Sequence, residues 1–178
     1  MKKLLLSLLV FLLPQLSWAQ LVLFEAHLSG LQENPPNLSP ATGFATASLD
    51  LSTDFFTFND SWTGLTTPST ASHIHSPGAP GVNAPVIIPF TAANGFVAGT
   101  TSGTVSYSGT LTSTQASQLL DGLFYVNVHS TTFPGGEIRG QLVAVAVPEP
   151  STYFLGGSGL IMLLVGRRFF SAPRHKIT

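Results

Sequence analysis

The sequence predicts an all-β, antiparallel sandwich or barrel with one short helix, and three observations favour this class. Short runs rich in Val, Thr, Leu and Phe recur between Gly, Pro, Asn and Asp breaks, which is the pattern of strands and turns. Within residues 43–51, apolar and polar side chains alternate with a period of two, as in a half-buried strand. The chain has no cysteine, so the fold must rely on its core rather than on disulfides.

The expected elements follow from the same signals. Strands are predicted at residues 21–28, 43–51, 55–62, 71–75, 86–90, 103–111, 123–129 and 137–145. One helix is predicted over residues 114–120, with Ser113 or Thr114 as its cap and its end before Gly122. Proline and glycine indicate rigid loops at residues 34–37 and 76–81.

Residues 1–19 have the order of a secretory signal peptide. Lys2 and Lys3 precede an apolar run at residues 4–13, and small residues follow at Ser17 and Ala19. The run is too short for a permanent membrane anchor. We therefore expect cleavage after Ala19 and export of the remaining chain.

The C-terminal segment, residues 148–170, combines a Pro-rich motif, an apolar stretch and two arginines. Its motif residues are Pro148, Glu149, Pro150, Arg167 and Arg168. The segment resembles the PEP-CTERM sorting signal of Gram-negative bacteria, although a polar tail at residues 171–178 extends beyond the arginines. A plain C-terminal membrane anchor is the alternative, and the arginines would then lie on its cytoplasmic side.

The PEP-CTERM resemblance implies a route for the protein. The precursor would be held in the inner membrane, processed by an exosortase-type enzyme, and delivered to the cell surface or extracellular matrix, with extracellular polysaccharide as a partner. The working domain is then expected at residues 20–147.

Removing both terminal segments changes the charge. The whole chain has a formal charge of −1, whereas residues 20–147 hold Arg139 as the only base against seven carboxylates, a net charge of −6. An acidic domain with one base argues against nucleic acid and anionic lipid as partners. It is compatible with divalent cations or neutral glycans.

Three histidines are the candidate metal ligands. His73 and His75 are two residues apart on a predicted strand, so their side chains point to the same face. His129 ends another predicted strand, on which it shares a face with Asn127, and His27 is a weaker fourth candidate. Neutral imidazole suits zinc and copper. The alternative is a hydrogen-bonded histidine pair that holds no metal.

Glu137 and Arg139 also lie two residues apart, on one face of the last predicted strand. We expect structural ion pairs here, either between these two residues or between Arg139 and another acid.

Four sequence blocks resemble the CHRD domain, named after its repeats in chordin. They are Leu28 to Pro36, Ala41 to Gly43, Ala71 to His75, and Tyr125 to His129 continuing through Phe133 to Leu142. The resemblance spans about residues 23–143 and implies an immunoglobulin-like β-sandwich. It implies no settled biochemical activity, so the expected role is non-enzymatic binding or structure.

A remoter similarity connects the histidines with Cu/Zn superoxide dismutase. It would make His73, His75 and His129 copper ligands and Arg139 a guide for superoxide. The chain departs from that family because it lacks both the disulfide and the histidines of a zinc subsite.

No nucleophile elbow, phosphate loop or dinucleotide fingerprint occurs. The sequence therefore predicts that the protein is not an enzyme. Glycan recognition by Trp62, Phe96 or Tyr107 stays open, with core packing as the alternative use of each ring.

Overall fold

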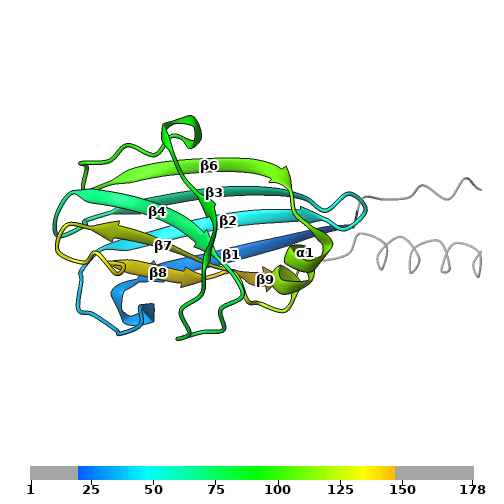
Figure 1. Ribbon diagram of the computed structural model, residues 1–178, viewed down its shortest axis with the longest axis horizontal. Helices are drawn as coiled ribbons and strands as arrows, with labels where there is room; N and C mark the ends of the chain where they lie inside the picture. Colours follow the sequence, from blue (N-terminus) through cyan, green and yellow to red (C-terminus); the bar gives the residue numbers. More distant parts are fainter. Residues whose placement is uncertain (1–19, 147–178) are drawn as a thin grey trace, which may run out of the picture. The chain divides into compact units, whose positions relative to one another are not determined.

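One continuous antiparallel sheet of nine strands makes up the domain in the computed structural model, which describes residues 20–146 (Figure 1). The strand order is β5-β4-β7-β8-β1-β2-β3-β6, and β9 pairs with β1 beside β8. The sheet curls into a half-barrel around the core. The prediction of an all-β, antiparallel fold with one short helix is therefore confirmed.

The elements agree closely with the predicted ranges. The strands are β1 Leu21–Ser29, β2 Thr42–Asp50, β3 Phe55–Thr63, β4 Ser69–His75, β5 Val86–Pro89, β6 Gly103–Thr110, β7 Tyr125–Ser130, β8 Ile138–Gln141 and β9 Val143–Val145. The helix α1 is Ser113–Leu120, and two 3₁₀ turns, η1 Gly30–Gln32 and η2 Ala92–Asn94, lie in loops.

Alternation along the strands separates the core from the outer face. In β3, Phe56 and Phe58 are at most 1% exposed, whereas the intervening Thr57 is only half-buried. Each buried phenylalanine contributes about 1.5–3 kcal/mol of transfer free energy. The same alternation makes Ile74 fully buried between the two histidines of β4.

Aromatic pairs close the core between distant parts of the sheet. Phe58 of β3 stacks on Phe90, which follows β5, with ring centroids 5.4 Å apart. Phe56 meets Phe124, which precedes β7, edge to face at 6.3 Å. Because β3 and β5 lie near opposite ends of the strand order, these contacts hold the two ends over a shared core.

The cap of the helix lies one residue before the first expected cap, Ser113. Thr112 is the N-cap: its hydroxyl accepts a hydrogen bond from the Gln115 backbone N–H, and the Gln115 side chain returns to the Thr112 backbone. This capping box satisfies two backbone donors that the first turn leaves free. Ala116 and Leu119 are the buried residues of the helix.

The last predicted strand is divided in two. At Leu142 the backbone N–H donates to the Phe124 carbonyl at 2.9 Å, and the side chain is fully buried. This contact separates β8, which pairs with β7 and β1, from β9, which pairs with β1 alone. Glu137 stands just before β8 rather than within the strand.

The predicted signal peptide, residues 1–19, and the predicted sorting segment with its tail, residues 148–178, lie outside the described residues. Among residues 20–146, no helix has the length and apolar character needed to cross a membrane.

Candidate metal centre

The three candidate histidines stand on two neighbouring strands. His73 and His75 lie on β4 and His129 lies on β7, and these strands pair antiparallel with His73 opposite Asn127 and Ala71 opposite His129. Their side chains leave the outer face of the sheet, because Ile74 and Val128 fill the core on the inner face. His73 and His75 therefore lie on one face of the sheet, as predicted, and His129 lies on the same face.

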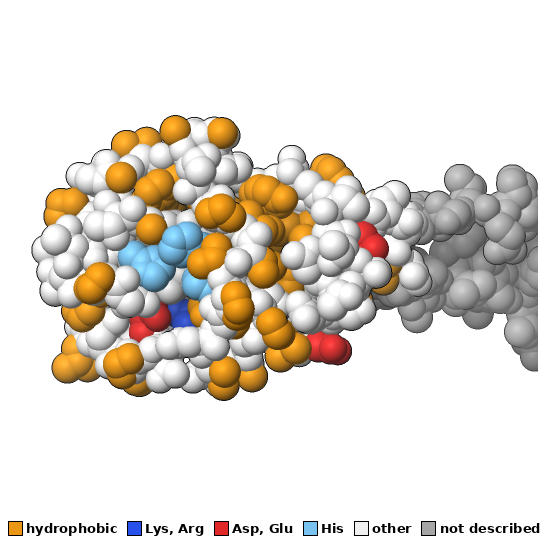
Figure 2. Space-filling view, in the orientation of Figure 1, with side chains coloured by type: hydrophobic (Ala, Val, Ile, Leu, Met, Phe, Trp, Pro, Cys, Tyr) orange, Lys and Arg blue, Asp and Glu red, His pale blue; other side chains and the backbone are white. Residues whose placement is uncertain are grey.

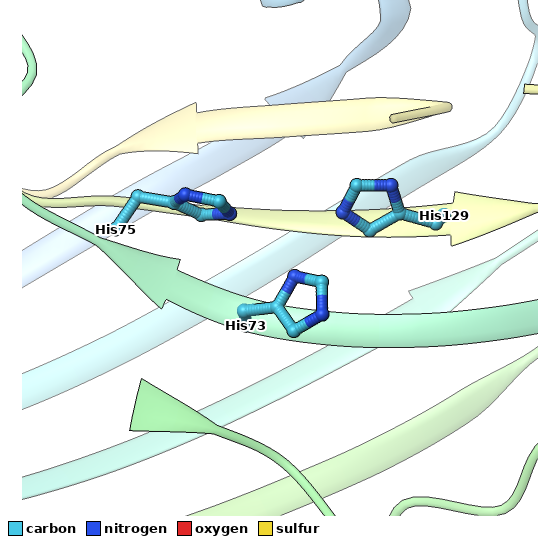
Figure 3. Close-up of side chains that lie close together, drawn as sticks. All are labelled: His73, His75 and His129. Carbon is cyan, nitrogen blue, oxygen red and sulfur yellow. The ribbon is translucent and has the colours of Figure 1, made fainter. Parts of the chain in front are cut away.

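The imidazole rings of these residues converge (Figure 3). The His73 ring centroid lies 4.8 Å from that of His129 and 5.4 Å from that of His75, both at steep angles. One ring nitrogen from each residue lies within 4.8 Å of the other two. His75 is buried and His73 and His129 are half-buried, so the centre is reached from one side of the sheet.

Backbone carbonyls orient two of the rings. Nδ1 of His75 lies 2.8 Å from the Ala84 carbonyl oxygen, and Nδ1 of His129 lies 2.9 Å from that of Pro134. Since a carbonyl only accepts, each Nδ1 donates its hydrogen. Metal-binding histidines commonly have this arrangement, in which one nitrogen is held by an outer acceptor and the other faces the metal.

The third ring has a free nitrogen. Nδ1 of His73 is buried and has no hydrogen-bond partner within the part of the chain that the structure describes. An orphaned buried nitrogen is uncommon and calls for an explanation such as an absent ion or water. A metal ion among the three rings would supply that partner.

All three histidines are held in the neutral form that a metal requires. Burial, followed by the nearby His129 and His75, lowers the pKa of His73 to about 4. Burial is also the main cause that lowers the pKa of His75 and of His129. Because binding needs a deprotonated imidazole, no proton has to leave these ligands near neutral pH.

Arg139 stands beside the centre and does not pair with Glu137. Its guanidinium donates to the carbonyls of Ala79 and Val82 and to the side chains of Asn83 and Gln141. It also lies over the Tyr125 ring, 3.4 Å from the centroid. The arginine therefore ties the loop at residues 76–85 to the outer face of the sheet.

Glu137 has a different environment. One of its carboxylate oxygens accepts hydrogen bonds from the Ser39 hydroxyl and the Thr66 backbone N–H, both at 2.7 Å. The ion pair considered between Glu137 and Arg139 is replaced by these separate networks. The reason is that loops from elsewhere in the chain supply the hydrogen-bond partners of each group.

Sequence reasoning gave no role to Glu33, which the fold brings near Arg139. The two residues line a hollow of about 320 Å³ together with Gln32 and Gln141. Glu33 is 5% exposed, and its Oε1 has no partner among the described residues. Burial raises its pKa to about 7, against the opposing effect of Arg139. Only its position before the two prolines marked it in the sequence.

The face as a whole gathers these groups. Figure 2 shows histidine side chains clustered over the region of β4 and β7, with basic and acidic side chains beside them in a recess. The weaker fourth candidate, His27, is exposed on β1 and contacts the Phe44 ring at 5.0 Å. It does not belong to the three-histidine group. We call His73, His75 and His129 the histidine centre.

The aromatic rings considered for glycan contact have other positions. Trp62 and Phe96 are 4% and 9% exposed and contact each other at 6.2 Å. Tyr107 is half-buried against the core. Core packing accounts for these three side chains.

Comparison with known families agrees with the fold and its motifs. The model of the CHRD domain matches residues 24–142, which is most of the sheet and every residue of the histidine centre. The chain belongs to the CHRD domain family. No curated protein and no solved structure matches it. The CHRD domain of this chain thus carries the histidine centre on β4 and β7, within the matched region.

Proposed function

We propose that this CHRD domain binds one copper or zinc ion through His73, His75 and His129. The observation that carries the proposal is the grouping of one nitrogen from each ring within 4.8 Å. The lowered pKa values and the two Nδ1–carbonyl contacts support it, because they leave neutral imidazoles with an unprotonated nitrogen turned inward.

The donor set favours these two metals. Three imidazoles without thiolate or carboxylate suit zinc and copper better than calcium or magnesium, which prefer oxygen. Three protein ligands also leave a position for water or a small ligand. The four-coordinate Zn–N length of about 2.0–2.1 Å requires nitrogens about 3.4 Å apart, so metal entry would draw the rings together by up to about 1.4 Å.

The ring with the most freedom for this movement is that of His73. Its Nδ1 makes no hydrogen bond and its side chain is half-buried, whereas carbonyls hold the rings of His75 and His129. We therefore assign His73 as the residue that closes the site on the ion.

The cellular location of this metal-binding domain is proposed from the sequence. The signal-peptide pattern of residues 1–19 and the motif at Pro148 to Pro150 support export, processing by an exosortase-type enzyme and a non-enzymatic role at the cell surface or in extracellular polysaccharide. A reporter fused to residues 148–178 tests the sorting step. Unchanged reporter location in a host without the processing enzyme would contradict it.

Metal analysis of the full chain, purified without chelators in mild detergent, tests the binding step. We expect about one equivalent of copper or zinc, lost in His75→Ala and His129→Ala and retained in His27→Ala, whose histidine lies outside the centre. His73→Gln takes the place of His75→Ala and His129→Ala as the test variant where those two do not fold. Metal content below about one-tenth of an equivalent, or equal content in His75→Ala and wild type, would overturn the proposal.

A further inference from the structure

Asn127 occupies the middle of the histidine centre. It lies on β7, opposite His73 of β4 on one side and Arg139 of β8 on the other, and is 3% exposed. Oδ1 of its side-chain amide lies 3.0 Å from Nε2 of His75 and 3.1 Å from Nε2 of His129. One amide thus contacts two of the three candidate metal ligands.

The backbone carbonyls decide where the imidazole protons lie. Nδ1 of His75 faces the Ala84 oxygen and Nδ1 of His129 faces the Pro134 oxygen, so each Nδ1 carries a hydrogen. In a neutral ring the other nitrogen, Nε2, then has only a lone pair. Both lone pairs then face Oδ1 of Asn127, which has no hydrogen to donate.

The amide must therefore be turned by about 180° about its Cβ–Cγ bond, so that it presents its nitrogen where the structure places Oδ1. An oxygen at this place would face two lone pairs, whereas the NH₂ group has two hydrogens, one for each Nε2. Amide oxygen and nitrogen are distinguished by their hydrogen-bond network, and this network requires the NH₂ orientation. The amide oxygen would suit this place only if both rings were imidazolium cations, each donating from Nε2. Burial and mutual repulsion disfavour two such adjacent charges.

We infer that Asn127 closes the metal-free centre by donating one hydrogen bond to His75 and one to His129, and so competes with the metal for these nitrogens. The inference rests on the proposed function. It makes Asn127 a positioning residue that lowers metal affinity.

This arrangement implies reversible binding. Without a metal, the centre leaves few buried groups unsatisfied, since Nδ1 of His73 is the one buried ring nitrogen of the centre that lacks a partner among the described residues. The domain therefore needs no metal to fold, unlike a structural zinc site. A centre that is stable both empty and filled suits taking up and releasing an ion.

Affinity measurements on the full chain test the competition. Asn127→Leu keeps the branched shape of the side chain and removes both hydrogen bonds, so we expect copper or zinc to bind at least about tenfold more tightly than in wild type. Asn59→Leu, on the exposed face of β3, is the matched control and should bind like wild type. Equal or weaker binding in Asn127→Leu would overturn the inference.

A second measurement needs neither metal nor variant. Nitrogen NMR of the metal-free wild-type protein should show protonated Nδ1 and unprotonated Nε2 in both His75 and His129, with the Asn127 NH₂ group protected from exchange. A protonated Nε2 in either ring would overturn the inference even if Asn127→Leu does not fold. Wild-type protein that binds no metal would instead overturn the proposed function, so the two failures are distinguishable.

Discussion

The guanidinium carbon of Arg139 lies 3.4 Å from the centre of the Tyr125 ring. The same tyrosine ring lies parallel to that of His75, within 3° and at 4.7 Å. Since β7 runs between β4 and β8, the Tyr125 ring contacts His75 of one neighbouring strand and Arg139 of the other. The only base of the domain is thus packed, through one aromatic ring, beside a candidate metal ligand.

Replacing Arg139 should destabilise the domain severely. The side chain is 1% exposed and donates to the carbonyls of Ala79 and Val82, and Met would leave the Val82 carbonyl without a partner among the described residues. We expect Arg139→Met to lower the free energy of unfolding by about 2–4 kcal/mol in urea titrations. Arg139→Lys keeps the charge but not the fork of donors, and should lose most of the same stability. A loss within about 0.5 kcal/mol for both variants would contradict this interpretation.

Asp60 should make stability fall as the pH rises. Its carboxylate is 3% exposed, neither oxygen has a partner among the described residues, and burial raises its pKa to about 7. A pKa above the unfolded value means that the folded state binds the extra proton, so its contribution is complete below about pH 4 and is lost as the pH rises through about 7.

The comparison of Asp60→Asn with wild type isolates this effect. The stability of the variant relative to wild type should increase from pH 5 to about pH 7, by up to about 1.4 kcal/mol per pH unit, and should level off at higher pH. Denaturant midpoints across that range provide the measurement, and Asp121→Asn, at an exposed residue, is the control. A difference that does not vary with pH would show that Asp60 does not titrate there.

The helix cap gives a smaller and sharper prediction. Thr112→Ala removes the acceptor for the Gln115 N–H and should cost about 1 kcal/mol. Ser113→Ala, one residue later, should be nearly neutral because its side chain is exposed and makes no cap contact. Chemical denaturation of both variants checks the pair. Equal losses would show that the cap does not act through Thr112.

Metal binding should persist below the usual histidine range. Because burial lowers the pKa of His73 to about 4 and lowers those of His75 and His129, protons compete with the metal only in more acidic solution than for a free imidazole near 6.5. A titration of bound metal against pH should therefore have its midpoint below about 6.5. Release already complete at that pH would contradict the burial of the ligands.

The sequence predicted local features well and long-range ones poorly. Alternation alone places His73 and His75 on one face, and it also places Asn127 with His129. That β4 and β7 pair is a contact between segments about fifty residues apart, and no local pattern specifies it. The three-histidine centre could therefore be suggested but not assembled from the sequence.

Glu137 and Arg139 are a second case in which the partners of a residue could not be predicted from the local sequence. Their spacing correctly suggested a shared region, yet their partners come from loops distant in the chain: Ser39 and Thr66 for the acid, Ala79 and Val82 for the base. The cap at Thr112 was missed by one residue, because Ser and Thr occupy several adjacent positions and each can cap a helix.

The central claim is that three imidazoles hold one metal ion. X-ray absorption spectroscopy of the full chain loaded with one equivalent of zinc measures this directly. Three nitrogen scatterers at about 2.0–2.1 Å with the outer-shell signature of imidazole, reduced to two in His73→Gln, are the predicted result. A shell of oxygen alone, or a spectrum unchanged by that substitution, would contradict it.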